Sequence, residues 1–159
     1  MKNLLGALML GALMLAGTGI AQAKTVSRDD VLDAITVFQK DASSREGIAA
    51  ASTIMAFARS SDAVHLSISK AVAPWVKGQD APDADTRGML LTAYIAGNIH
   101  AQLASGKAGD DVYAGWQQVL ATYAQLVQIN PAAKLPEVEE LKKKEAAGAL
   151  RAYAARMEK

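Results

Sequence analysis

Two long apolar segments joined by a short glycine-containing linker, together covering residues 89–129, constrain this chain more than any other stretch. In the first segment, large apolar residues recur at the helical period: Leu91, Ile95, Ile99 and Leu103. Its other sides are also largely apolar and carry small residues such as Ala93 and Gly97. A helix that is apolar on most sides is buried, and small residues let a neighbouring helix approach closely. With the linker at 105–109, the pattern predicts an antiparallel hairpin of two helices.

The second segment of this hairpin has one apolar side and one polar side. The apolar side includes Trp116, Leu120, Tyr123, Ala124 and Val127, and the polar side carries Gln117, Gln118, Thr122, Gln125 and Gln128. Asp110 is expected to cap the helix, with Asp111 in its first turn. Pro131 ends the helix, because proline disfavours the α conformation in the residue before it. The uncharged, amide-rich side is either a solvated surface or a surface for a partner.

The N-terminus has the three parts of a secretory signal peptide. Lys2 is followed by an apolar run over residues 4–15 and by Ala-Gln-Ala at residues 21–23, which is a cleavage site of the A-x-A type. The apolar run is too short for a stable membrane span. We therefore expect a signal peptide at 1–23 and a mature domain at 24–159, located in a bacterial periplasm or secreted, without stable membrane insertion.

Charge and cysteine content exclude several classes of function. The chain has 17 Lys and Arg against 16 Asp and Glu. Because Lys2 is the only charged residue in 1–23, the mature chain is formally neutral, which argues against nucleic-acid binding. The chain has no cysteine, so disulfides, thiol catalysis and zinc–thiolate sites are excluded. Stability has to come from the packing of helices.

Periodicity along the chain predicts an all-α fold, a single compact domain of five or six antiparallel helices. The expected helices are 28–42, 45–60, 62–73, 85–104, 110–130 and 136–157. Ser27 is a suitable cap for the first, and Pro136 suits the first turn of the last. Residues 64–69 alternate as a strand would, but the apolar spacing continues helically to Trp75, so a helix ending near Pro74 is predicted.

The last predicted helix carries a run of acids followed by lysines. The pairs Glu139–Lys143 and Glu140–Lys144 have the favourable spacing of four residues, which is typical of a solvated helix face. Glu145 falls on the apolar side of this helix together with Lys142 and Arg156, where an ion pair is expected. The helix is expected to loosen near Gly148.

No catalytic motif is present, and we predict that the protein is not an enzyme. The sequence has no phosphate-binding glycine loop, no G-x-S-x-G and no H-E-x-x-H. His65 and His100 lie 35 residues apart, and only Asp62 is spaced to share a helix face with His65. The aspartates of the loop at 77–85 lack the late glutamate of a calcium loop. We predict no catalytic residue, no metal site and no cofactor.

Asn98 and Gln102 are the most informative polar residues, because they lie one turn apart within the apolar row of the first hairpin helix. Buried amides need hydrogen-bond partners, so this pair either ties down a neighbouring loop or lines a cavity. Together with Trp75 and Tyr94 it forms the candidate binding site.

Two functions follow from these observations. The leading hypothesis is a non-enzymatic binding protein that acts on another exported protein, including an inhibitor or immunity role. The alternative is a small-ligand carrier whose pocket between helices is lined by Trp75, Tyr94, Asn98 and Gln102. The hairpin, with Tyr123 and Pro131, is similar to tetratricopeptide-type helix pairs, but no second copy follows at a fixed period. In size and compartment the chain also resembles small all-helical immunity proteins, without a motif that establishes membership.

Overall fold

The computed structural model describes residues 25–76 and 83–158. The signal peptide predicted at 1–23 and most of the loop predicted at 77–85 lie outside these residues. The described chain contains helices and no strand, which confirms the all-α class. Its elements are α1 (Arg28–Lys40), α2 (Arg45–Ser60), α3 (Ala84–Ser105), α4 (Val112–Ile129), a short 3-10 helix η1 (Pro131–Ala133), α5 (Pro136–Ala146) and α6 (Leu150–Ala154).

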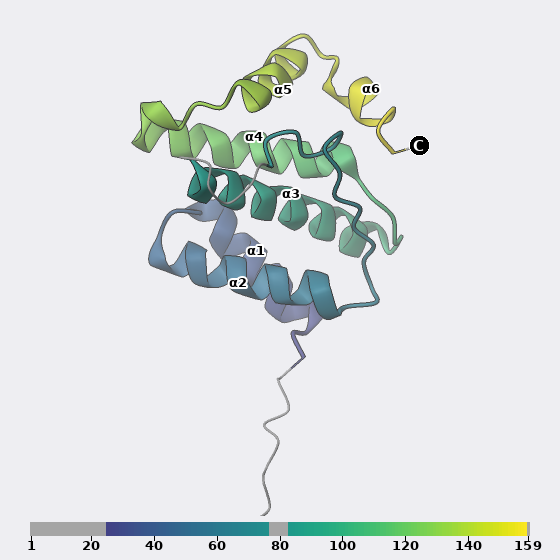
Figure 1. Ribbon diagram of the computed structural model, residues 1–159. Coiled ribbons are helices and arrows are strands. Elements are labelled where there is room, and N and C mark those ends of the chain that lie inside the picture. The colour runs from purple at the N-terminus through teal and green to yellow at the C-terminus, as the bar shows by residue number, and fades with distance from the viewer. Residues whose placement is uncertain (1–24, 77–82, 159) are drawn as a thin grey trace, which may run out of the picture.

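The helices are stacked in layers (Figure 1). Helices α1 and α2 pack on each other, as do α3 and α4, and α5 and α6 lie over α4 on the side away from α1 and α2. Fully buried side chains come from every layer and include Phe38, Tyr94, Trp116 and Val138. One continuous apolar core therefore runs through the stack.

Close packing of α3 on α4 depends on glycine in both helices. A Cβ atom added to Gly97 would lie 2.5 Å from the carbonyl oxygen of Ala114, and one added to Gly115 would lie 2.6 Å from the ring of Tyr94. Both distances are shorter than a carbon atom tolerates. The prediction that small residues let a second helix approach this one closely is confirmed.

The prediction of a helix at 62–73 is wrong. Residues 61–76 form an extended segment with isolated turns, which crosses in front of α3 and α4 (Figure 1). This segment is fixed at one end to Gln102 and at the other to Arg87. Those two residues are separated by about 22 Å along α3 at the helical rise of 1.5 Å per residue. The chain from His65 to Trp75 would span only about 15 Å as a helix but reaches about 33 Å when extended.

Side chains of α3 and α4, and of the loop between them, supply the hydrogen bonds that a neighbouring strand would otherwise give to this extended segment. The amide of Gln102 accepts from His65 N at 2.8 Å and donates to His65 O at 2.7 Å. Three further contacts follow along the segment: Asp110 accepts from Ser67 N at 2.9 Å, Trp116 Nε1 donates to Val72 O at 2.7 Å, and Arg87 Nη1 donates to Trp75 O at 2.6 Å. The alternation of residues 64–69 therefore indicated an extended conformation, although this segment does not pair with a strand in the described chain.

The helix predicted at 136–157 is divided in two. Helix α5 ends at Ala146, and Gly148 has a φ of +67° before α6 begins at Leu150. Only glycine adopts that conformation without cost. Stacking of Tyr153 on Trp116, with ring centroids 5.2 Å apart, holds α6 against α4. The expected loosening near Gly148 is therefore a complete break.

The remaining helices agree with the sequence to within two residues at each end. Ser27 caps α1, as expected from the sequence, and the side chain of Asp30 completes a reciprocal capping box. At the start of α4, Asp111 and not Asp110 is the cap, since its side chain accepts from Ala114 N at 2.8 Å. Asp110 instead holds the extended segment through Ser67.

Candidate functional site

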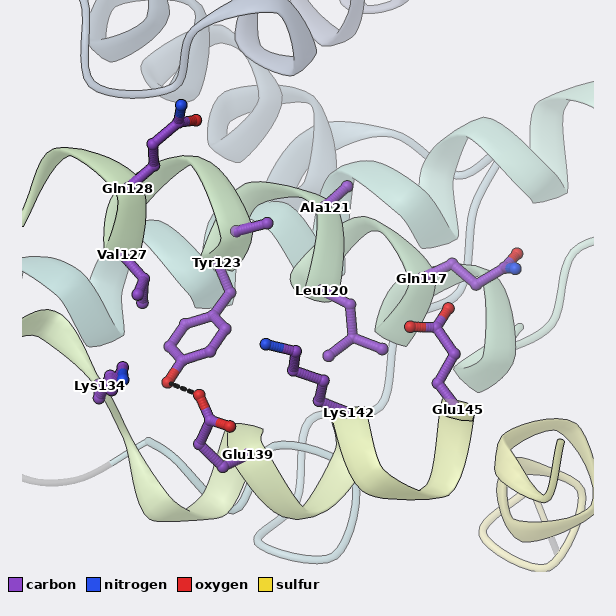
Figure 2. A pocket seen from close by; sticks show the side chains of 11 residues that line it. Gln117, Leu120, Ala121, Tyr123, Val127, Gln128, Lys134, Glu139, Lys142 and Glu145 are labelled. Carbon is purple, nitrogen blue, oxygen red and sulfur yellow. Dashed lines mark hydrogen bonds between the residues drawn. The ribbon is translucent and has the colours of Figure 1, made fainter. Parts of the chain in front are cut away.

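An open groove of about 700 Å³ lies between α4 and α5 (Figure 2). Its floor is the side of α4 that carries Leu120, Ala121, Ala124 and Val127. Ala121 and Ala124 are exposed there. The rest of the lining is polar and comes mainly from the ends of α4, from α5 and from the link before it.

The floor of the groove corrects the predicted sides of the second hairpin helix. Ala124 was expected to be buried and is exposed, whereas Thr122 was placed on the polar side and is buried. Thr122 accepts a hydrogen bond from Gln118, which also accepts one from Gln39 of α1. Helix α1 thus contacts the part of the amide-rich side that carries Gln118 and Gln125, and α4 is left open beside α5.

Tyr123 joins the floor of the groove to its wall. Its hydroxyl donates to Glu139 Oε1 of α5 at 2.8 Å and accepts from Leu135 N at 3.0 Å. Burial of the ring, followed by the hydrogen bond to the Glu139 carboxylate, raises the pKa of Tyr123 to about 12. The hydroxyl is therefore protonated at neutral pH, and Glu139 is engaged by it rather than by Lys143.

Charged side chains are distributed along the rim of the groove. Lys142 extends over the floor between Tyr123 and Leu120, Glu145 lies near Gln117 at one end, and Lys134 lies near Val127 at the other end (Figure 2). Glu145 is exposed, so its predicted position on the buried side of the helix is wrong. The break at Gly148 turns the chain away before this residue can be covered.

Ion pairing on α5 also differs from the predicted spacing of four residues. Lys143 pairs with Glu140, three residues away, at 2.6 Å. Lys144 lies over the ring of Tyr153, 4.5 Å from its centroid. The three lysines thus have different surroundings: Lys143 lies on the solvated face, Lys142 lines the groove and Lys144 contacts α6.

The four residues predicted as a binding site lie together in the core and do not line the groove. Trp75, Tyr94 and Asn98 have no exposed surface and Gln102 has 2%. The rings of Trp75 and Tyr94 meet edge to face at 6.3 Å, and Gln102 Nε2 donates to Asn98 Oδ1 at 2.9 Å. Their role in binding a ligand or partner stays a prediction.

Hydrogen bonds of the amide pair run to two loops. Besides holding His65, Gln102 accepts from Gly109 N at 3.1 Å, and Asn98 accepts from Asp111 N at 2.9 Å. The pair thereby fixes the extended segment and the α3–α4 loop on the same side of α3. Of the two roles derived from the sequence, the tying of loops is the one that these contacts display.

The histidines are exposed: His65 on the extended segment, where its ring lies 3.5 Å from Ser67 Oγ, and His100 on α3. In the described chain, no group of three or more His, Cys, Asp or Glu side chains is placed to hold a metal ion. None of the described helices combines the length and the hydropathy needed to cross a bilayer.

A comparison with known proteins finds no family model, no curated protein and no solved structure that matches this chain. The site must accordingly be judged on its own geometry. Sequence reasoning missed the groove because it placed Ala124 and Val127 in a covered arc. The available signal was the spacing of Gln117, Ala121, Ala124 and Gln128, which forms one small or polar stripe along α4.

Proposed function

We propose that this protein is an exported, non-enzymatic binding protein, and that the α4–α5 groove receives an amphipathic helix of another exported protein. The observation that carries the proposal is the exposed apolar floor of the groove, bounded by charged side chains on α5 and on the link before it. An inhibitor or immunity role, in which the bound helix belongs to the target, is one form of this function.

The dimensions of the groove suit a helix. From Gln117 to Gln128 the floor covers about 16 Å of α4, which matches about three turns of a bound helix. Exposed Ala121 and Ala124 allow another helix backbone to approach closely, and apolar anchors at helical spacing would meet Leu120 and Val127. Apolar floors with polar rims are typical of helix-in-groove recognition.

The rim charges give the bound helix a preferred direction. Glu145 at one end favours the positive end of a helix dipole, and Lys134 at the other end favours the negative end. The helix would then run parallel to α4, with acidic residues opposite Lys142 and Lys134. Exposed charges of this kind contribute about 0.2–1 kcal/mol each, so they orient the partner more than they hold it.

A site-specific photo-crosslinker tests the proposal in the periplasm of living cells. Placed at Ala124 in the groove, it should capture one defined protein, and the same group at exposed Ala56 of α2 should not. Adding Ala121→Arg to the Ala124 variant should abolish the product while the fold, checked by circular dichroism, is kept. Equal capture at both positions, or capture that survives Ala121→Arg, would contradict the proposal.

A small-ligand carrier is the second candidate, and one observation favours it. Trp75, Tyr94 and Asn98, three of the four residues predicted to line its pocket, each bury a polar atom that no described protein group pairs with. Organic extraction of the purified protein followed by mass spectrometry tests this function. A stoichiometric small molecule would support the carrier, and its absence would leave the groove as the functional site.

A further inference from the structure

Three hydrogen-bond donors are buried in the core beneath the extended segment. Trp75 Nε1, Tyr94 Oη and Asn98 Nδ2 have no exposed surface and no hydrogen-bond partner among the described residues. Tyr94 and Asn98 lie one turn apart on α3, and Trp75 meets the Tyr94 ring edge to face. Buried polar groups are rarely left unpaired, since the lost hydration is not recovered.

The orientation of Asn98 is fixed, so its donor cannot be exchanged for its acceptor by turning the amide. Gln102 must direct its oxygen at His65 N and Gly109 N and its nitrogen at His65 O. Its nitrogen therefore also faces Asn98, which has to present Oδ1 to Gln102 and to Asp111 N. Asn98 Nδ2 is thus left as a donor without a partner among the described residues.

The surroundings of Tyr94 indicate which charge a molecule bound by these donors can carry. Burial, followed by the acidic side chains of Asp110 and Glu158, raises the pKa of Tyr94 well above its ordinary value. The Asn98 amide beside the hydroxyl offsets part of this rise, although the two atoms lack hydrogen-bond geometry. The hydroxyl therefore remains a donor, and the same acidic side chains repel an anion.

We propose that Trp75, Tyr94 and Asn98 form an internal binding site for a small, neutral hydrogen-bond acceptor. All three unpaired atoms can donate, so the bound molecule has to supply oxygen lone pairs. An internal water and the carbonyl or ether oxygen of a small organic molecule share this chemistry. Because the site has no exposed surface, the molecule exchanges only when the extended segment, which contributes Trp75, moves. The inference is independent of the α4–α5 groove.

The sign of a stability change tests whether the site is occupied. If an acceptor is bound, Tyr94→Phe removes a hydrogen bond and should lower the melting temperature by about 3 °C. If the hydroxyl is unpaired, the same change removes a buried polar group without a partner and raises it. Tyr123→Phe is the matched control, because that hydroxyl has two protein partners and its removal lowers the melting temperature in either case.

A second measurement on the unaltered protein identifies the bound molecule and does not depend on the folding of a variant. A high-resolution crystal structure should contain density within hydrogen-bond distance of Tyr94 Oη and Asn98 Nδ2. Native mass spectrometry separates the two sources: an added organic mass identifies a carried ligand, and its absence together with the density identifies water. Empty density combined with a stabilising Tyr94→Phe would overturn the proposal. Loss of groove crosslinking would not affect it.

Discussion

A single hydroxyl, that of Tyr123, connects the floor and the wall of the groove. The residue is 2% exposed, and its hydroxyl donates a hydrogen bond to the Glu139 carboxylate. Burial of the ring, followed by the hydrogen bond to the Glu139 carboxylate, raises the pKa of Tyr123 to about 12 from an ordinary value of 10.0. The hydrogen bond therefore belongs to the protonated form, and its contribution to stability depends on pH.

We expect the stabilising effect of this hydroxyl to disappear at high pH. A pKa that is raised on folding gives stability that is complete below pH 10 and is lost as the pH rises through 12. The difference between 10.0 and about 12 corresponds to about 3 kcal/mol. Urea unfolding of the unaltered protein and of Tyr123→Phe should differ in free energy at pH 8, and the difference should shrink at pH 11.5. A difference that stays constant would show that the hydroxyl does not titrate in this way.

Among the elements, α3 shows how strongly the allowed residue size depends on the facing helix. Gly97 and Gly88 lie on the same helix, but only Gly97 faces α4, while nothing lies within 4 Å of a Cβ atom added to Gly88. The two glycines therefore separate the cost of a packing clash from the ordinary preference of helices for alanine.

Alanine should have opposite effects at these two positions. Gly97→Ala forces α4 away from α3 and should lower the free energy of unfolding by about 2–3 kcal/mol. Gly88→Ala should raise it by up to about 1 kcal/mol, since alanine favours the helix. Chemical denaturation of both variants measures the contrast. A Gly97→Ala protein as stable as the parent would mean that the two helices are not packed this closely.

The individual elements also show which parts of the fold could be predicted from the sequence. The periods of α1 to α4, the cap Ser27 and the first-turn residue Pro136 are local signals, so these helix starts could be located from their own residues. Segment 61–76 could not, because its conformation is set by Gln102, Asp110 and Trp116, which lie far along the chain. The break at Gly148 was visible as a weak point, but its completeness depends on the stacking of Tyr153 on α4.

At the scale of the whole molecule, Arg87 joins three parts of the fold. Its guanidinium contacts Trp75 O at 2.6 Å, Asp83 Oδ1 at 2.7 Å and Glu137 Oε1 of α5 at 3.5 Å, and the side chain is almost completely buried. One fork-shaped group therefore connects the end of the extended segment, the start of α3 and the start of α5.

Lysine cannot replace this arginine, because one ammonium group does not reproduce the planar fork. Arg87→Lys should lower the free energy of unfolding by about 2–3 kcal/mol and increase hydrogen exchange in both the extended segment and α5. Exposed Arg59 of α2 provides the control, and Arg59→Lys should change stability by less than about 0.5 kcal/mol. An equal, small effect at both positions would contradict the joining role of Arg87.

The candidate site was only partly predictable from the sequence, because it depends on how whole helices are placed relative to one another. Sequence patterns indicated that Asn98 and Gln102 are buried and need partners, which follows from their place in an apolar row. The groove arises where α5 leaves part of α4 uncovered, and no local pattern in α4 records which neighbour is missing. Glu145 and Lys142 were predicted to form an ion pair on the apolar side of the last helix, and neither was predicted to line a groove.

The side-chain amide of Gln102 has a consequence beyond the folded monomer. Residues 64–69 alternate and are rich in β-branched and apolar side chains, a composition that favours pairing between chains when such a segment is free. Open strand edges are a principal route to aggregation. By bonding to both backbone groups of His65, Gln102 occupies the edge that another molecule would otherwise use. The amide thus acts as a gatekeeper for solubility, and its loss would endanger the protein through self-association before it affected any partner.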